Sequence, residues 1–252
     1  MNLLLDLGNT RLKWALSQDS GWLARGAVAW NEDVPGALAQ AWHELPSPDR
    51  VFGASVVDAS RESMVADVAE RVFARNTDWL HTPAFACGVR NAYPEPQRLG
   101  VDRFLAMVAA HAESHVPCVL AGVGTALTLD ALAADGRHLG GLIAPGPQLM
   151  QQSLLGATVR VRPERPGQVM DAADNTADAV ASGCWQAVAA LIERFVTRIT
   201  PQLGVTPALH LGGGDAEALL PLLSMPAQVM TDGVLHGLSV WAAAQSLPEA
   251  DI

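Results

Sequence analysis

The sequence predicts an α/β fold built from two similar lobes, and three observations lead to this prediction. Short apolar runs of strand length alternate along the chain with longer runs of helical periodicity. A group of consecutive strand-like runs opens the first half, and a second such group opens the second half. The 252 residues also suffice for two hydrophobic cores, since domains commonly comprise about 100–150 residues.

The first lobe, residues 1–115, should begin with strands and turns and continue as alternating strands and helices. Apolar runs bounded by turn residues predict the strands, and apolar residues spaced three or four apart predict the helices. A proline-rich stretch, NAYPEPQRLG, precedes the last helix as a loop. The expected strands are residues 3–5, 12–16, 22–30 and 50–56, and the expected helices are residues 35–43, 61–74 and 102–113.

The second lobe, residues 116–252, repeats this opening. After Pro117 the runs PCVLAG, ALTLDALA and HLGGLIAPG follow one another, with the tight turn VGT between the first two. The two halves correspond in the order of elements and turns and hardly in residue identity, so we expect a structural repeat. Further along we expect a helix at 174–199, a strand at 208–214, and helices at 216–223 and 233–247.

Composition and charge exclude several classes of function. The chain is 50% hydrophobic and 17% charged, which is typical of a compact globule. Its formal net charge of −10 would repel a nucleic-acid backbone or an anionic membrane surface. The longest uncharged apolar run, residues 116–129, is too short to span a bilayer. With three distant cysteines and no signal-peptide pattern, we expect a reduced, cytoplasmic protein whose partners are neither nucleic acids nor membranes.

Three turns of one type are candidates for holding phosphate groups. In DLGNT (6–10), GVGT (122–125) and LGGGD (211–215), a buried strand ends in glycines that let backbone N–H groups approach a ligand. Neither a dinucleotide-binding fingerprint nor a GxxxxGK[ST] loop is present. Each turn alone is more typical of an ordinary hairpin, whereas the three together favour a nucleotide held between two lobes.

Asp6 ends the first apolar run, and its carboxylate needs a partner there. A buried carboxylate without one is costly. Either Asp6 caps its own turn, or a cation lies in front of it. We favour the cation, because burial of the charge is otherwise hard to justify.

Together these motifs resemble type III pantothenate kinase, a family of the actin-like, sugar-kinase and Hsp70 ATPase superfamily. The resemblance covers residues 2 to about 240 and rests on DLGNTRLKWAL, the spacing from Tyr93 to LGVDRF, GVGTALTLD with GGLIAPG, NTADAVASG and LGGGDA. It implies two ribonuclease H-like, actin-like ATPase domains with a nucleotide cleft between them. It also implies transfer of the γ-phosphoryl group of ATP to pantothenate, the first step of coenzyme A biosynthesis, by a homodimer with its substrate pocket near the subunit interface.

The resemblance further implies two phosphate loops and a magnesium site. Asp6 corresponds to the carboxylate near Mg²⁺, and such a carboxylate can hold the hydrated ion against the phosphate oxygens. LGGGDA corresponds to the turn on the adenosine side. Without the resemblance, Thr125 is an ordinary strand residue and Asp215 a helix N-cap. The implied ATP-binding residues are Asp6, Leu7, Gly8, Asn9, Thr10, Arg11, Leu12 and Lys13 in the first loop, and Thr125 in the second.

The motif GVDR corresponds to the family's substrate motif. Asp102 takes the place of the proposed general base, and the guanidinium fork of Arg103 suits the pantothenate carboxylate. At a predicted helix N-terminus the pKa of Asp102 should be lowered, so it would orient the hydroxyl and accept the proton late. Alternatively, Asp102 is a plain N-cap, Arg103 a surface residue and Thr176 a helix cap. The implied substrate-binding residues are Tyr93, Gly100, Val101, Asp102, Arg103 and Thr176.

Gly122 departs from the family pattern. Many members have an aspartate at this position, which binds a monovalent cation, K⁺ or NH₄⁺, near the phosphates. Gly122 has no side chain for this purpose. We therefore expect that the protein needs no potassium through that carboxylate, or obtains the charge from another group such as a lysine.

Two other functions are also compatible with the sequence. One is a sugar or small-alcohol kinase of the same superfamily, and the other is a non-catalytic regulatory or accessory protein that keeps the fold and the nucleotide site. The GVDR motif with Tyr93 favours pantothenate over a sugar. Retention of Asp102 argues against a protein that only binds, because such a protein has no evident use for a base.

Overall fold

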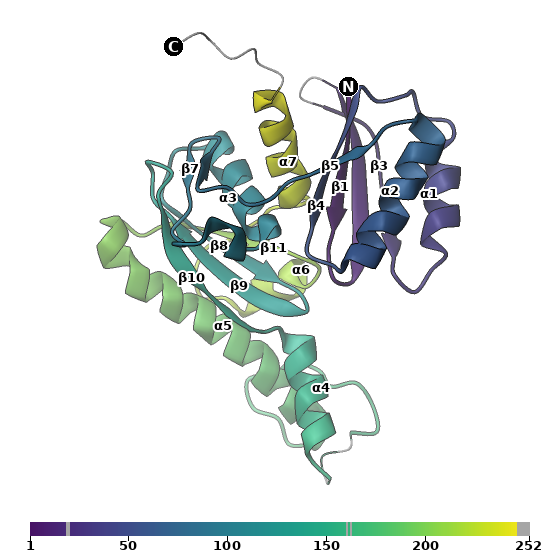
Figure 1. The fold of residues 1–252 in the computed structure, drawn as a ribbon. Coiled ribbons are helices and arrows are strands. Elements are labelled where there is room, and N and C mark those ends of the chain that lie inside the picture. Colours follow the sequence, from purple (N-terminus) through teal and green to yellow (C-terminus); the bar gives the residue numbers. More distant parts are fainter. Residues whose placement is uncertain (19–20, 160, 162, 246–252) are drawn as a thin grey trace. The chain divides into compact units, whose positions relative to one another are not determined.

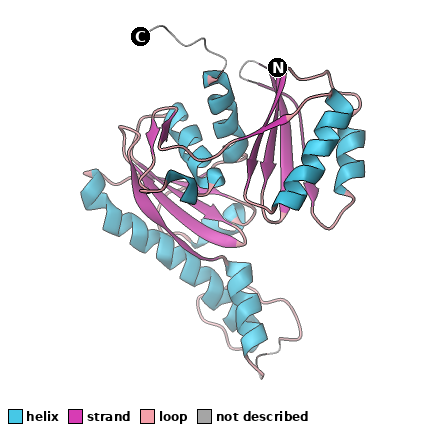
Figure 2. Cartoon of the chain, in the orientation of Figure 1, coloured by secondary structure: helices cyan, strands magenta, loops and turns pink. Residues whose placement is uncertain are grey.

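The computed structural model describes residues 1–18, 21–159, 161 and 163–245 (Figures 1 and 2). The chain forms two compact units. Unit 1 contains Met1–Ser114 and the stretch that begins at Asp232, and unit 2 contains His115–Thr231. Each unit has a five-stranded sheet of its own. This confirms the predicted α/β class with two similar lobes.

In unit 1, three antiparallel strands continue into two parallel ones. The strand order is β3-β2-β1-β4-β5, with β1 antiparallel to β2 and parallel to β4. The strands are β1 (Asn2–Leu7), β2 (Arg11–Gln18), β3 (Gly21–Ala29), β4 (Arg50–Ser55) and β5 (Thr77–Trp79), with a small hairpin of β6 (Phe85–Ala86) and β7 (Val89–Arg90). The helices are α1 (Val34–Trp42), α2 (Ala59–Phe73), η1 (Pro96–Arg98), α3 (Val101–Glu113) and α7 (Gly233–Ala244).

Helices cover both faces of this sheet, α1 and α2 on one side and α3 and α7 on the other (Figure 1). Leu3, Leu5 and Leu7 of β1 belong to the core that includes α1 and α2. Leu4 belongs to the core that includes α3 and α7. Successive side chains of a strand point to opposite faces. Asp6 therefore lies on the face that carries α3 and α7.

Unit 2 repeats this strand arrangement. Its order is β10-β9-β8-β11-β12, with β8 antiparallel to β9 and parallel to β11. This confirms the repeat that the sequence predicts. The elements are β8 (Cys118–Val123), β9 (Ala126–Leu132), β10 (His138–Pro145), α4 (Pro147–Ala157), α5 (Thr176–Leu203), β11 (Ala208–Gly212), α6 (Ala216–Leu219), η2 (Leu220–Leu222) and β12 (Gln228–Val229).

Helix α5 is the main core helix of unit 2. Its buried side chains, among them Val188 and Ile192, pack with alternate residues of β8, β9 and β11. Within the described residues, α5 is also the one helix that is long and apolar enough to cross a membrane. Half of that apolar stretch is buried inside the protein. Its apolar character is therefore accounted for by packing against the sheet.

The structure corrects the expected division of the chain in one respect. We expected residues 116–252 to form the second lobe, but α7 groups with unit 1. Leu235 and Leu238 of α7 pack with Leu4 and with α3. At Gly237 the helix lies so close to the backbone of Leu105 that an added Cβ would collide with it. The apolar residues of α7 are explained by this packing.

Several short elements also differ from the expectation. Helix α4 was not predicted, and α6 is only four residues long where a longer helix was expected. The edge strands β5 and β12, of three and two residues, and the β6–β7 hairpin were not predicted either. Strands of two or three residues are too short to show a periodicity.

Candidate active site

The turn between β1 and β2 forms the first predicted phosphate loop. The N–H group of Gly8 donates to the carbonyl oxygen of Arg11 at 3.2 Å and so closes the turn. Asn9 is exposed at its tip. Asp6 and Lys13 are direct cross-strand partners on either side of the turn. Their side chains therefore lie beside each other on one face of the sheet.

Asp6 stands close to charges from three other elements. Loss of hydration raises its pKa from 3.8 to about 7, although Lys13 acts to lower it, and the carboxylates of Asp102 and Asp232 raise it further. Asp102 lies in the first turn of α3, and Asp232 directly precedes α7. The two helices on this face thus bring two more carboxylates near Asp6. Lys13 does not offset the burial of Asp6 and the effect of these two carboxylates on its pKa, so the site suits an additional cation.

Asp232 binds two cationic side chains of the sheet. Its Oδ1 lies 3.0 Å from Nζ of Lys13, and its Oδ2 lies 3.1 Å from Nη1 of Arg25. Its φ of 54° is in the left-handed region, which few residues other than glycine adopt. Lys13 is therefore oriented by the residue at which the chain re-enters unit 1.

Asp102 and Arg103 occupy the start of α3. The N-cap is Gly100, and Oδ1 of Asp102 accepts from the N–H of Arg103 at 2.8 Å. Arg103 is only 6% exposed, and its Nη1 donates to the hydroxyl oxygen of Tyr93 at 3.3 Å. The Arg103 guanidinium also lies 5.9 Å from the centre of the Tyr93 ring. The alternative of an N-cap followed by a surface arginine is therefore wrong.

The loop that carries Tyr93 is braced by Asn91. Oδ1 of Asn91 accepts from the N–H of Tyr93 at 2.9 Å. Its Nδ2 donates to the carbonyl oxygens of Pro96 at 3.1 Å and Pro83 at 3.4 Å. Because one amide joins three parts of the loop, Tyr93 is held in a defined position beside Arg103.

In unit 2, three glycine-containing segments meet around Thr125. Thr125 is exposed in the β8–β9 turn, and its carbonyl oxygen accepts from the N–H of Gly146, the N-cap of α4, at 3.0 Å. A Cβ on Gly146 would collide with the carbonyl oxygen of Gly124. A Cβ on Gly213, in the LGGGD turn, would likewise collide with the carbonyl oxygen of Val123, and Gly213 has a φ of 93°. The second predicted phosphate loop, the LGGGD turn and the N-terminus of α4 are thus neighbours.

Gly122 lies opposite Thr128 in the β8–β9 pair. A Cβ added to Gly122 would lie 2.6 Å from Oγ1 of Thr128. The threonine hydroxyl therefore occupies the space where a longer side chain at position 122 would begin.

Thr176 is exposed as the first residue of α5, and it is not the cap of that helix. The cap is Asn175, whose Oδ1 accepts from the N–H of Asp178 at 3.1 Å. The alternative role of Thr176 as a helix cap is therefore wrong. The hydroxyl of Thr176 does not serve to cap α5.

A segment before α5 runs along this helix and is bound to it by polar contacts. Nη1 and Nη2 of Arg165 donate to Oδ1 and Oδ2 of Asp178 at 2.8 and 2.9 Å. The N–H of Gln168 donates to Oδ1 of Asp178 at 2.7 Å, and that of Met170 donates to Oγ of Ser182 at 3.0 Å. Hydrogen bonds from Arg165 above all hold the pKa of Asp178 well below its ordinary value.

Comparison with known proteins decides the family. Residues 2–198 match the family described as type III pantothenate kinase. The chain belongs to this family. It is 43% identical to the type III pantothenate kinase of Stenotrophomonas maltophilia strain K279a, over 96% of this chain and 97% of that protein. It is 42% identical to the type III pantothenate kinase of Laribacter hongkongensis, over 95% and 97% of the two chains.

Solved structures support the fold of this type III pantothenate kinase family member. A protein from Sinorhizobium meliloti described as a 2-dehydro-3-deoxygalactonokinase matches with a TM-score of 0.63 and 15% identity. The match covers 98% of this chain and all of that chain. At this identity the likeness concerns the fold alone.

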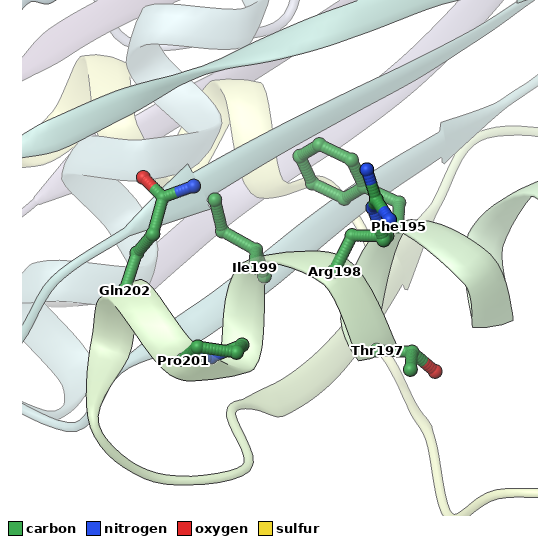
Figure 3. A pocket seen from close by; sticks show the side chains of 6 residues that line it. All are labelled: Phe195, Thr197, Arg198, Ile199, Pro201 and Gln202. Atoms are coloured by element: carbon green, nitrogen blue, oxygen red, sulfur yellow. The ribbon is translucent and has the colours of Figure 1, made fainter.

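A hollow on α5 contributes none of the residues that the family resemblance points to. It has a volume of about 470 Å³ and lies along the C-terminal half of that helix (Figure 3). The lining residues are Phe195, Thr197, Arg198, Ile199, Pro201 and Gln202. The hollow therefore does not coincide with the candidate site residues of this family member.

The carboxylates fit the magnesium ion that a kinase of this family implies. No cluster of three or more acidic, histidine or cysteine side chains with metal-binding geometry occurs among the residues that the structure describes. Mg²⁺ does not require one, because it keeps several water ligands and often takes one carboxylate together with substrate phosphates. Asp6, with its raised pKa and an excess of negative charge around it, suits that role.

The sequence motifs identify Asp6, Lys13, Asp102, Arg103 and Tyr93 as candidates, and all five lie in unit 1. Asp6 lies near Lys13 and Asp102, and Arg103 is bound to Tyr93. The motifs do not include Asp232, which lies 219 residues from Lys13 along the chain. No local pattern marks Asp232, since it stands between a short edge strand and an apolar helix. Only a signal that pairs distant positions would have revealed it.

Proposed function

We propose that this protein transfers the γ-phosphoryl group of ATP to the hydroxyl of pantothenate and forms 4′-phosphopantothenate, the first step of coenzyme A biosynthesis. Membership of the type III pantothenate kinase family gives the reaction. The observation that carries the proposal is the arrangement of unit 1, in which Asp6, Lys13 and Asp102 lie around one end of the sheet. Phosphoryl transfer depends mainly on positioning and charge neutralisation, which such a set can supply.

For ATP, we assign residues 6–13 as the first phosphate loop and Thr125 as part of the second. Lys13 would neutralise charge on the phosphates, and Asp6 would hold Mg²⁺, which when bound neutralises the developing charge on the transferred group. The neighbouring Gly146 at the start of α4 supports the assignment of Thr125, because a helix N-terminus favours an anion. The LGGGD turn would receive the adenosine.

For pantothenate, we assign Tyr93, residues 100–103 and Thr176. Asp102 would orient the attacking hydroxyl and accept its proton, and Arg103 would bind the carboxylate. The buried position of Arg103 supports this role, because a poorly hydrated guanidinium binds a carboxylate more strongly than an exposed one does. Its contact with Tyr93 fixes the direction of the guanidinium.

Gly122 leads us to propose that this protein differs from many members of its family in its use of monovalent cations. It has no carboxylate at the position where K⁺ or NH₄⁺ would bind, and the hydroxyl of Thr128 fills the adjacent space. We therefore propose turnover without K⁺.

We further propose a cytoplasmic homodimer that binds neither nucleic acid nor membranes. The net charge of −10 supports the absence of polyanionic partners. Exposed apolar side chains are frequent between residues 142 and 170 of unit 2, which supports burial against a second copy. They are Leu142 and Ile143 of β10, Leu149 and Leu154 of α4, and Val159, Val169 and Met170 in the segment that follows.

An ADP-release assay with alternative acceptors tests the proposed reaction. The purified protein is supplied with Mg²⁺, ATP and pantothenate, with glucose and N-acetylglucosamine as control acceptors. We expect ADP release with pantothenate only, and a product mass equal to that of 4′-phosphopantothenate. Equal rates with every acceptor would indicate a different kinase, and ADP binding without turnover would indicate an accessory protein.

The variant Asp102→Asn separates the base from the nucleotide site. We expect its turnover to fall by about 100-fold or more, because a general base commonly contributes that much. Its affinity for ADP, measured by calorimetry, should stay within about twofold. An unchanged rate would remove the assignment of Asp102.

A further inference from the structure

Both ends of the first phosphate loop are hydrogen-bonded to one tryptophan. Nε1 of Trp30 donates to the carbonyl oxygen of Gly8 at 2.7 Å. The backbone N–H of Trp30 donates to the carbonyl oxygen of Thr10 at 3.4 Å. Trp30 directly follows β3. This strand pairs with β2, the strand that begins after the turn. A single residue thus binds the carbonyl groups on either side of Asn9.

These two bonds determine where the loop presents its N–H groups. In a trans peptide the C=O of one residue and the N–H of the next point in opposite directions, and no cis peptide is present among the described residues. With the Gly8 carbonyl directed at Trp30, the N–H of Asn9 must point away from it. Asn9 is exposed, so this donor is available to a ligand on the open side of the loop.

Trp30 is itself held in place. Its ring is partly buried and packs against the core formed by β1, β2, α1 and α2. The guanidinium of Arg61, in the first turn of α2, lies 4.8 Å from the centre of the ring. Arg61 in turn lies 3.7 Å from the carboxylate of Asp58, the N-cap of α2. The orientation of the indole is therefore set by a helix as well as by the loop.

We propose that Trp30 is a positioning residue for ATP, which fixes the peptide of Gly8 and Asn9 so that its N–H faces the phosphates. The proposal rests on the proposed function, because it takes residues 6–13 as a phosphate loop. Without the indole N–H, the peptide between Gly8 and Asn9 can rotate. Nucleotide binding must then restore its orientation, which lowers the affinity. Pantothenate, which we assign to other residues, should be affected much less.

Two replacements at Trp30 test this assignment. Trp30→Phe keeps an aromatic ring next to Arg61 and loses the N–H donor. Replacement of Trp30 by 3-benzothienylalanine keeps the shape of the indole and loses only the donor. The matched control is Trp241→Phe, in α7, whose ring packs edge-on against Phe52 in the core on the opposite face of the sheet from Trp30. The measurements are the KM values for ATP and pantothenate, kcat, ADP affinity by calorimetry, and Tm.

We expect both replacements at Trp30 to weaken ADP binding and to raise the KM for ATP by about fivefold, the effect of one lost hydrogen bond. The KM for pantothenate and the Tm of the benzothienyl protein should stay near those of the wild type. Trp241→Phe should leave the KM for ATP unchanged. Nucleotide affinity within twofold of the wild type in the benzothienyl protein would overturn the proposal, as would an equal loss for ATP and pantothenate.

The wild-type protein in the same experiment separates the two proposals. If it neither binds ADP nor phosphorylates pantothenate, the proposed function fails. If it does both, and the benzothienyl protein behaves identically, the function stands and only the role of Trp30 is wrong.

Discussion

Asp6 combines an unfavourable environment for its charge with a proposed role in binding Mg²⁺. Its carboxylate is poorly hydrated and stands near two other carboxylates, so in the free protein its charge destabilises the fold. A bound cation would reverse this effect. The lysine across the strand pair compensates only in part, since it is also bound to Asp232.

The raised pKa of Asp6 predicts a pH-dependent effect of Asp6→Asn on stability. Because the pKa is 3.8 in the unfolded chain and about 7 in the folded one, ionisation costs the wild type stability as pH rises between these values. Without Mg²⁺, the Tm of Asp6→Asn should therefore exceed that of the wild type at pH 8, by several degrees, and the two should converge near pH 4. Thermal unfolding across this pH range measures the difference.

Magnesium supplies the control for this experiment. Mg²⁺ with ADP should raise the Tm of the wild type by more than that of Asp6→Asn, because the variant lacks the carboxylate assigned to Mg²⁺ and keeps the other residues assigned to the nucleotide. A wild type that is the more stable protein at pH 8 without Mg²⁺ would contradict the raised pKa.

Gly122 leads to a prediction about potassium. Wild-type turnover in a Tris buffer should change by less than about twofold when K⁺ is added, because no carboxylate is present at position 122 to bind it. Gly122→Asp, whose Cβ would force Thr128 to turn, should lower the rate and make it respond to K⁺. Gly122→Asn is the uncharged control. Initial rates over a K⁺ titration decide this, and wild-type turnover that requires K⁺ would contradict the prediction.

At the scale of elements, the contacts between residues 165–170 and α5 show how a loop can be fixed on a helix. Asp178 is almost fully buried. Its carboxylate accepts hydrogen bonds from the guanidinium of Arg165, the N–H of Gln168 and the side-chain amide of Asn175. Gly167 lies so close to Ala177 that a Cβ would collide with its carbonyl oxygen. The start of α5, where Thr176 is exposed, is therefore ordered by a segment that has no regular structure of its own.

Arg165→Met should release this segment. Because the pKa of Asp178 is lowered in the folded protein, its pairing stabilises the fold above about pH 4 and is lost as pH falls further. Thermolysin should therefore cut within residues 163–174 several times faster in the variant at pH 7, and Tm should fall. Arg137→Met, at an exposed hairpin, is the control. Unchanged cleavage would show that Arg165 does not hold the segment.

At the scale of the whole molecule, the property to test is the oligomeric state. Ile143 is 66% exposed in β10, which is unusual for so apolar a side chain in a strand. Ile143→Glu should weaken the proposed homodimer at least tenfold, because a charge would be buried in the interface. Sedimentation velocity over a range of concentrations measures it. Val205→Glu, at another exposed apolar residue, should leave the dimer intact; identical sedimentation of both variants would contradict this interface.

Much of the fold was predictable because local patterns encode it. The three strands that open each unit, and helices α2, α3 and α5, have clear periodicity and capping residues such as Asp58 and Asn175. Helix α4 was missed because Gly146 and Pro147, which begin it, also mark loops. The assignment of α7 was wrong because an apolar helix does not indicate which sheet it covers.

The sequence by itself determined the family and the repeated α/β architecture, and it gave most residues of the candidate site, because motifs such as DLGNT and GVDR are contiguous and their chemistry can be read locally. Only the tertiary structure decided that Asp232 binds Lys13, that Arg103 is buried beside Tyr93, and that Trp30 holds the turn at Gly8. These contacts join residues that are distant along the chain or share no pattern. The packing of unit 1 around its sheet brings these residues together. Periodicity along the chain does not indicate which distant residues will be in contact.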